Sequence, residues 1–201
     1  MKSIDFWTGN RVRARAPTFD DIDAFLVDSR DGDAQRFGDE IRLPIHPDAL
    51  KIRIEKSWSP ENDKTWLAIE TLDNELVGSI NVHEADRRNR NFTYGIAVFR
   101  DRRRKGFASE AIALLLRYYF RELGYHRANA DVYAFNKPSI ELHRRLGFVE
   151  EGRVRQSLYT SGEFHDALIF GMLIDEFDAL EKTLPEVRLA GGDAAGNNLV
   201  V

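Results

Sequence analysis

The chain of 201 residues contains no cysteine. This absence excludes a disulfide framework, a thiolate nucleophile and a Cys-ligated zinc site, and it fits a cytoplasmic protein. No stretch approaches the roughly 18 consecutive apolar residues of a membrane-spanning helix. The first residues, Met1 to Asn10, lack the apolar core of a secretory signal peptide. We therefore expect a cytoplasmic protein without a membrane partner.

The sequence also has no excess of positive charge. Lysine and arginine total 29, aspartate and glutamate total 33, and the formal net charge is −4. A general nucleic-acid-binding surface requires a basic excess, so no nucleic-acid partner is expected. The length suits one domain with a sizeable core, which we assign to residues 1–185. Residues 186–201 are expected to form a flexible C-terminal tail.

Apolar residues recur with the spacings of strands and helices, and their order predicts an α/β (α+β) fold with helices packed on one sheet. Residues 28–47, which contain several acidic side chains, are expected to be a loop. The expected strands are residues 11–16, 65–70, 76–83, 92–99, 126–133, 148–158 and 164–173. The expected helices are one that begins after Thr18, and residues 49–58, 106–123, 139–146 and 173–183.

The most informative segment is residues 103–108, which read Arg-Arg-Lys-Gly-Phe-Ala. It follows a strand-like run and opens a strongly amphipathic helical run. Glycine lets backbone N–H groups approach a ligand closely, and a helix start adds unpaired N–H donors and a partial positive charge. With three adjacent cations, the segment is a candidate site for a phosphate or pyrophosphate. The alternative is a solvated turn, the usual meaning of a charge run.

Three motifs stand in a fixed order around this segment. Val98 lies five residues before the Arg-x-x-Gly-x-Ala pattern at 103–108. Asn136 and Ser139 follow the next expected strand, and Leu-Gly-Phe at 146–148 ends the helix after it. Either half of this pattern is weak alone, whereas the pair is specific. Together the motifs resemble the GCN5-related N-acetyltransferase (GNAT) superfamily.

The resemblance covers residues 10–175, and the features around Tyr159 and 171–173 look like its ribosomal-protein-alanine N-acetyltransferase branch. It implies a single-domain GNAT fold, with a mixed sheet of about seven strands and helices on both faces. The strands at 92–99 and 126–133 would run parallel and splay apart around the cofactor. A β-bulge in the first of them would free backbone groups for that cofactor.

The cofactor that the resemblance implies is acetyl-CoA, with coenzyme A as the product. The turn would hold the pyrophosphate through backbone N–H groups, Asn136 would hydrogen-bond the pantetheine arm, and Arg102, Arg104 or Lys105 would reach the 3′-phosphate. Arg104 stands where relatives often carry glycine, so the turn must leave room for it. The cofactor-binding residues implied are Val98, Arg103, Arg104, Lys105, Gly106, Phe107, Ala108 and Asn136.

Three residues are candidates for catalysis in this family context. Ser139 is expected near the cofactor sulfur, where a donor can protonate the leaving thiolate. His143 stands where many relatives place a tyrosine, and it is either that acid or a surface residue of the helix. Many relatives carry a strand-borne glutamate base, and here that position appears as Asn91. Glu84 is then the candidate base, through water, and loss of the proton to solvent is the alternative.

The sequence therefore predicts an acetyl-CoA-dependent N-acetyltransferase, a monomer or homodimer, in which a primary amine attacks the thioester directly. The acceptor would enter between residues 28–47 and the C-terminal hairpin. The branch resemblance favours a peptide or protein N-terminus. A polyamine or aminoglycoside-type amine is the alternative, because the acidic residues at 31–40 suit a cation. Further alternatives are a non-catalytic acyl-CoA-binding module and a basic-patch nucleic-acid module. No metal is expected, because the histidines lack metal-ligand spacing.

Overall fold

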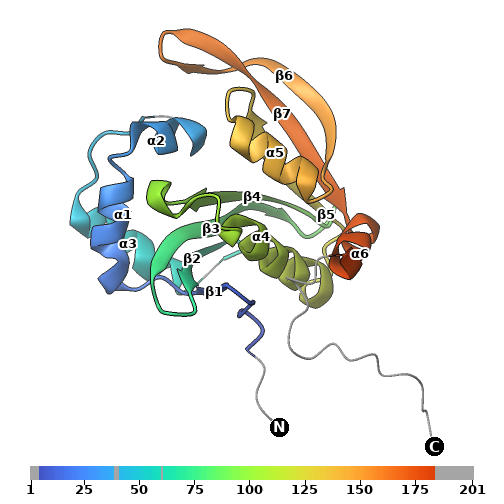
Figure 1. Ribbon diagram of the computed structural model, residues 1–201, viewed down its shortest axis with the longest axis horizontal. Coiled ribbons are helices and arrows are strands. Elements are labelled where there is room, and N and C mark those ends of the chain that lie inside the picture. Colours follow the sequence, from blue (N-terminus) through green and yellow to red (C-terminus); the bar gives the residue numbers. More distant parts are fainter. Residues whose placement is uncertain (1–4, 39–40, 60, 184–201) are drawn as a thin grey trace, which may run out of the picture.

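The computed structural model of the protein describes residues 5–38, 41–59 and 61–183, and the predicted tail at 186–201 lies outside them. One sheet runs through this part of the chain, in the order β1-β2-β3-β4-β5-β7-β6 (Figure 1). Neighbouring strands are antiparallel, except for the parallel pair β4 and β5. The predicted mixed sheet of about seven strands is confirmed. The strands are β1 (Val12–Arg15), β2 (Thr65–Thr71), β3 (Leu76–Asp86), β4 (Asn91–Val98), β5 (Arg127–Tyr133), β6 (Val149–Thr160) and β7 (Glu163–Leu173).

Within the same described ranges, six α-helices connect or flank the strands, and five of them lie where the apolar spacing predicts a helix. A π-helical turn, Tyr118–Glu122, continues α4 almost to the end of the predicted helix. Every helix in the described part of the chain is too short or too polar to traverse a bilayer. The helices are α1 (Ile22–Asp28), α2 (Gly32–Gly38), α3 (Pro47–Ser57), α4 (Phe107–Arg117), α5 (Lys137–Arg145) and α6 (Ile174–Thr183).

The helix α2 was not expected, so the prediction of one loop over residues 28–47 is wrong. The Asp31 carboxylate accepts hydrogen bonds from the backbone N–H groups of Asp33 at 3.1 Å and Ala34 at 3.2 Å. These bonds cap the first turn of α2. Apolar spacing does not reveal α2, because the helix is short and none of its side chains is completely buried. Contacts with distant residues, rather than apolar spacing, determine where it lies.

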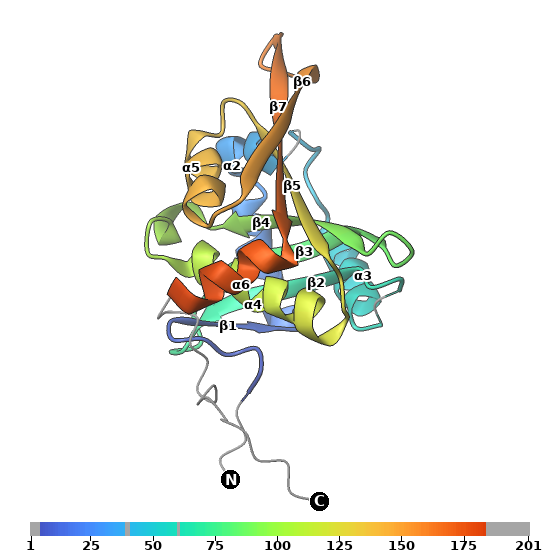
Figure 2. The same cartoon turned by 90° about the vertical axis from the view of Figure 1, so that its right-hand side faces the viewer.

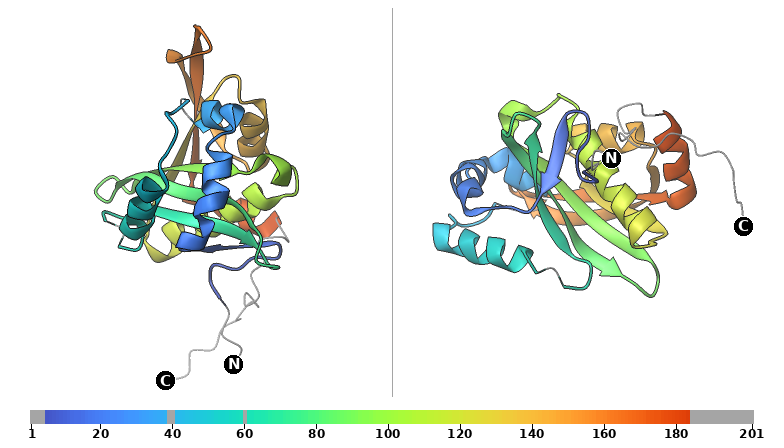
Figure 3. Two further views of the ribbon diagram at one scale, coloured as in Figure 1. Left: turned by 90° about the vertical axis from the view of Figure 1, so that its left-hand side faces the viewer. Right: turned by 90° about the horizontal axis from the view of Figure 1, so that it is seen from below.

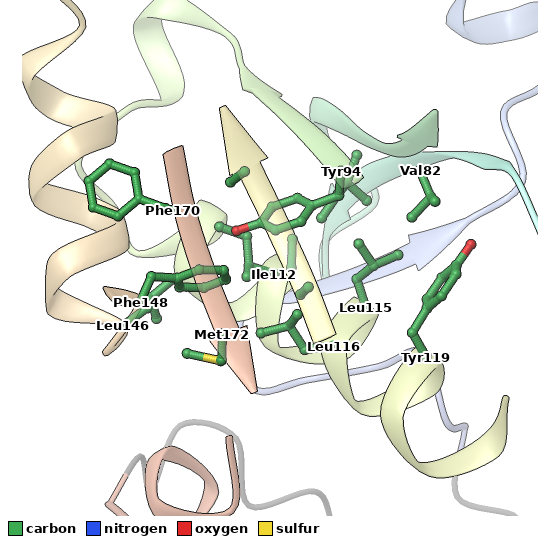
Figure 4. Close-up of a cluster of buried hydrophobic side chains, with 14 of the residues drawn as sticks. Val82, Tyr94, Ile112, Leu115, Leu116, Tyr119, Leu146, Phe148, Phe170 and Met172 are labelled. Carbon is green, nitrogen blue, oxygen red and sulfur yellow. The ribbon is translucent and has the colours of Figure 1, made fainter. Parts of the chain in front are cut away.

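Helices cover both faces of the sheet, because the side chains of each strand alternate between the faces. Trp66 and Ala68 of β2 pack with α1 and α3 in the smaller hydrophobic cluster, whereas Ile69 belongs to the larger cluster beneath α4. Figure 2 shows α4 and α6 on one side of the sheet, and Figure 3 shows α1 and α3 on the other. The larger cluster includes Tyr94 and Phe170 (Figure 4). Coverage of both faces, predicted from the resemblance, is confirmed.

The sheet divides where β4 and β5 stop pairing. The last of their register pairs joins Thr93 to Asn129. Beyond it, β4 stays paired with β3 as far as Val98, and β5 stays paired with β7 as far as Tyr133. The predicted divergence of these two strands is thus present, and it opens an edge between them. The three register pairs are Asn91–Arg127, Phe92–Ala128 and Thr93–Asn129.

In the pairing of β3 with β4 the β-bulge lies in β3, so the expectation of a bulge in β4 is wrong. Val82 pairs with Tyr94, whereas Glu84 pairs with the adjacent Thr93. The extra residue, His83, therefore belongs to β3. At this point β3 has passed its last pair with β2, which lies at Val82, whereas Thr93 of β4 is paired on both sides. The strand with one free side is the one that accommodates the extra residue.

Candidate active site

The segment between β4 and α4 is a turn with two residues in the left-handed conformation. Arg104 has a φ of 64° and Gly106, the N-cap of α4, has a φ of 83°. Left-handed residues beside ordinary ones turn successive N–H groups toward one side, which makes an anion-binding concavity. The unpaired N–H groups at the start of α4, at Phe107 and Ala108, extend it. The exposed Lys105 lies between the two left-handed residues. This geometry fits a pyrophosphate.

The turn accommodates Arg104 because its side chain is exposed. No such room exists at Gly106, where an added Cβ would lie 2.2 Å from Nη1 of Arg11. The guanidinium of Arg11, the residue before β1, therefore approaches the turn, and sequence reasoning missed it because Arg11 is remote in the chain. Arg102, a candidate for the 3′-phosphate, donates instead to Glu75 at 2.6 Å.

Val98 lies at the edge that opens between β4 and β5. The N–H of Phe99 donates to the Val77 carbonyl of β3 at 2.9 Å. Peptide groups alternate in direction along a strand, so those of Ile96 and Val98 point toward the opened edge. The Arg103 Nε donates to the Val98 carbonyl at 3.0 Å, which ties the turn to the end of β4. The N–H groups at this edge suit the amide carbonyls of a pantetheine arm.

The acidic side chains at the start of α2 are already paired with the turn. Asp31 accepts from Arg100 at 2.7 and 2.5 Å, and Asp33 accepts from the same guanidinium at 2.8 Å. The Nη2 atom of Arg103 lies 3.9 Å from the Oδ2 atom of Asp31. Hydrogen bonds from Arg100 hold the pKa of Asp31 well below its usual range. Part of the negative charge that would attract a cationic acceptor to this segment is thus compensated by Arg100.

Asn136 lies across the opened edge from Val98, after the end of β5. Its backbone N–H donates to the Tyr133 carbonyl at 2.8 Å, which closes the turn into α5. Its side-chain oxygen caps α5 by accepting from the Ser139 N–H at 3.2 Å. The side-chain amide nitrogen is the donor that remains for a pantetheine carbonyl. Ser139 is half-buried in the first turn of the same helix.

His143 is buried, with 2% of its surface exposed, so the alternative of a surface helical residue is wrong. Its Nε2 lies 2.9 Å from the hydroxyl of Tyr94, and its Nδ1 lies 2.8 Å from the Ser139 carbonyl and 3.3 Å from the Ser139 hydroxyl. The rings of Phe148 and Phe170 pack around it. Burial lowers the pKa of His143, and the hydrogen bond to Ser139 opposes this effect only in part. Sequence reasoning missed Tyr94, which reads as an ordinary strand residue.

Glu84 lies on the face of the sheet opposite α4, beside the end of the β4–β5 pairing. It pairs with Thr93, Thr93 pairs with Asn129, and Asp131 follows Asn129 by two residues on the same face. Loss of solvent raises the pKa of Asp131; the charge of His83 opposes this rise and that of Glu84 adds to it. Two carboxylates thus flank the opened edge, and only Glu84 was a candidate from the sequence. Among the described residues, no cluster of histidine and carboxylate side chains could hold a metal ion.

Comparison with known proteins agrees with this geometry. A family model described as "Acetyltransferase (GNAT) domain" matches residues 11–149. The SPbeta prophage-derived N-acetyltransferase YokL of Bacillus subtilis is 38% identical over 176 residues, which cover 88% of this chain and 97% of the relative. The spermidine N(1)-acetyltransferase of Vibrio cholerae is 26% identical over 106 residues, covering 53% and 61% respectively. A solved structure of the Vibrio cholerae spermidine N-acetyltransferase with CoA and spermine has a TM-score of 0.75 at 22% identity, covering 83% and 97%.

The chain therefore belongs to the GNAT acetyltransferase family. It is an N-acetyltransferase, and acetyl-CoA is its cofactor, as predicted. The left-handed turn, the start of α4 and the opened edge of β4 fit the phosphates and amides of that cofactor. Its membership of the ribosomal-protein branch stays a prediction.

Proposed function

We propose that the protein acetylates the primary amine of a peptide or protein N-terminus. The observation that carries this proposal is a cavity of about 650 Å³ lined by Arg153, Val154, Arg155, Gln156 and Asp166. It lies at the irregular part of β6 and next to the opened edge, because the Ala134 N–H after β5 donates to the Asp166 carbonyl at 2.9 Å. Arg153 donates to Asp166 at 2.9 Å, and the Arg155 guanidinium and the Gln156 side-chain amide can donate to carbonyl oxygens, so this lining suits a peptide backbone.

The charges around the opening support a peptide over a polycation. Asp31 and Asp33 are both paired with Arg100, which weakens this part of the acidic segment as an anchor for a second ammonium group. On the side of the hairpin Arg153 is paired with Asp166 at 2.9 Å, so Arg155 is the guanidinium that adds positive charge there. A polyamine would have to approach this guanidinium group, whereas a peptide presents carbonyl oxygens to it.

A polyamine is the second candidate acceptor, and one observation favours it. Glu84 and Asp131 flank the opening on the face opposite α4, where an ammonium group would be attracted. The relatives named as spermidine acetyltransferases point the same way. The two candidates therefore differ in which side of the opening contributes most of the binding energy.

For the donor side, we assign the residues as follows. The N–H groups from Gly106 to Ala108 hold the pyrophosphate, with Arg11, Arg104 and Lys105 as neighbouring cations. The edge of β4 at Val98 and the Asn136 amide hold the pantetheine arm. When bound, acetyl-CoA supplies an activated acetyl thioester. Arg103 supports the strand end through the Val98 carbonyl.

The chemical roles fall to groups on the two faces of the opening. The acceptor amine must lose a proton before it attacks, and Glu84, directly or through water, is the group that accepts it, with Asp131 beside it. A general base of this kind contributes about 10²- to 10⁴-fold in rate. On the side of α5, the Ser139 hydroxyl is the group that donates to the sulfur as it leaves.

An acceptor screen with acetyl-CoA tests the proposal, with release of free thiol as the readout. The panel is a set of N-terminal peptides, spermidine, free amino acids and an aminoglycoside. We expect the highest kcat/KM for a peptide. We also expect Arg155→Ala to raise the KM for that peptide and to leave the KM for spermidine unchanged. A higher kcat/KM for spermidine than for every peptide would overturn the proposal in favour of the second candidate.

A further inference from the structure

We propose that Tyr94 and His143 form a buried pair that orients the Ser139 hydroxyl toward the cofactor sulfur. The pair has no place in the roles assigned above, since neither side chain reaches the surface. Tyr94 is 3% exposed and His143 is 2% exposed. The inference rests on the proposed role of Ser139 and adds to it the two residues that position it.

The hydrogen-bond partners of His143 define its tautomer. The Ser139 carbonyl oxygen can only accept, and it lies 2.8 Å from Nδ1, so Nδ1 carries the hydrogen. The ring is neutral, because burial lowers its pKa. Nε2 is then an acceptor, and the Tyr94 hydroxyl, 2.9 Å away, donates to it. The direction of both bonds follows from the chemistry of one carbonyl group.

This tautomer decides where the hydrogen of the Ser139 hydroxyl can point. The hydroxyl oxygen lies 3.3 Å from Nδ1. Because Nδ1 already carries a hydrogen, the hydroxyl cannot donate to it and can only accept. Its own hydrogen is therefore directed away from the ring, toward the opened edge where the sulfur would lie. With the opposite tautomer, the hydroxyl would donate inward and the sulfur would lose that donor.

The surroundings keep the pair fixed. The ring of Phe170 stacks on the imidazole of His143 with the ring centroids 5.5 Å apart, and the ring of Phe148 packs edge-on with the centroids 5.1 Å apart. Figure 4 shows the Tyr94 hydroxyl pointing into the core toward Phe148 and Phe170. Tyr94 follows Thr93, the last residue of β4 that pairs with β5. The phenol therefore anchors the imidazole at the point where the sheet opens.

The pair positions a donor and does not relay a proton. A relay would move the Ser139 hydrogen to the sulfur, the Nδ1 hydrogen to Ser139 and the Tyr94 hydrogen to Nε2, which would leave a buried phenolate. Complete burial raises the pKa of Tyr94 well above its usual value, so that state is unfavourable. His143 and Tyr94 are accordingly positioning residues, and Ser139 alone among the three touches the reacting atoms.

A double-mutant cycle between His143 and Ser139 tests this inference. His143→Leu keeps an apolar side chain among the aromatic rings, and we expect it to lower kcat about tenfold, the loss of one aligned hydrogen bond. The KM for acetyl-CoA should stay unchanged. In a Ser139→Ala background, His143→Leu should cause no further loss, because there is no hydroxyl left to orient. His143→Asn, whose amide can mimic the Nδ1 donor, should recover most of the kcat.

The outcomes separate the possible errors. An equal loss from His143→Leu in both backgrounds would show a purely structural role and overturn the inference. Full kcat for His143→Leu would overturn it as well. Full kcat for Ser139→Ala would instead refute the proposed role of Ser139. The variant Tyr94→Phe combined with His143→Leu leaves no unpaired hydroxyl, so it gives the same test if His143→Leu alone folds poorly.

Discussion

Asp31, which caps α2, receives two hydrogen bonds from Arg100, which follows β4, at 2.7 and 2.5 Å. On the other side, the ring of Phe37 in α2 stacks on the ring of Phe135 with the centroids 6.1 Å apart. Phe135 follows the end of β5 and precedes Asn136. The short helix α2 is therefore attached to both sides of the opening between β4 and β5. The turn proposed to hold the phosphates and the segment that carries Asn136 are therefore both attached to one structural element.

We expect Asp31→Asn to weaken acetyl-CoA binding, because Arg100 loses its bidentate partner and the turn loses its support. The expected change is a rise of about threefold to tenfold in the KM for acetyl-CoA, about one charge-assisted hydrogen bond. The folded-state pKa of Asp31 is lowered, so its pairing persists above the unfolded pKa near 4 and is lost only at lower pH. The effect should thus be constant from about pH 6 to 9. Asp48→Asn on α3, which breaks an exposed pair with Lys51, is the control, and an equal KM effect there would contradict the prediction.

We expect Gly106→Ala to impair cofactor binding more severely. A left-handed conformation costs a residue with a side chain about 1–2 kcal/mol, and the new Cβ would lie 2.2 Å from the Arg11 guanidinium. Calorimetry should show at least about a tenfold loss of acetyl-CoA affinity. Gly38→Ala is the matched control, since a Cβ there meets nothing within 4 Å. Unchanged affinity for Gly106→Ala would show that the turn does not hold the phosphates.

We expect Glu84→Gln to lower kcat by about 10²-fold if this carboxylate is the general base. The loss should be greatest near neutral pH and should shrink at high pH, where the acceptor amine is already neutral. Asp131→Asn should have a smaller effect, because the proposed role of Asp131 is limited to its electrostatic interaction with Glu84. Glu163→Gln, at the exposed end of β7, should leave the profile unchanged. A larger loss for Asp131→Asn than for Glu84→Gln would exchange the two roles.

We expect nitrogen NMR to find His143 neutral, with its hydrogen on Nδ1. Its folded-state pKa is lowered, so the unfolded chain binds the proton more tightly, and folding stability is lost as pH falls through 6.5 toward the folded pKa. The His143 signals should therefore titrate only below the ordinary histidine pKa of about 6.5. A hydrogen on Nε2 would contradict the assignment.

The elements with strong patterns could be predicted from the sequence. The strand at 92–99, the helix at 106–123 and the turn between them were located from apolar spacing and glycine. The family assignment from Val98, the 103–108 segment and Asn136 was confirmed by the family model. Local chemistry decides these features, so one segment of sequence is enough to see them.

The parts that were missed depend on residues that meet only in the folded chain. Arg11, which precedes β1, lies close to Gly106, and Tyr94 of β4 contacts His143 of α5. No spacing rule connects such residues. The acidic segment is a similar case. The sequence shows the charges of Asp31 and Asp33, but it does not show that Arg100 pairs with them in the folded chain. The resemblance to the family predicted the bulge in β4. It lies in β3 because β3 is paired on one side only at that point.

The three register pairs between β4 and β5 also set the depth of the opening. Pairing advances along a parallel strand in steps of about 3.3 Å per residue. A deeper slot requires the pair Thr93–Asn129 to come apart, and a shallower one requires a new pair beyond it. We therefore expect the number of register pairs between β4 and β5 to limit how far a bound acyl group can extend between the two strands.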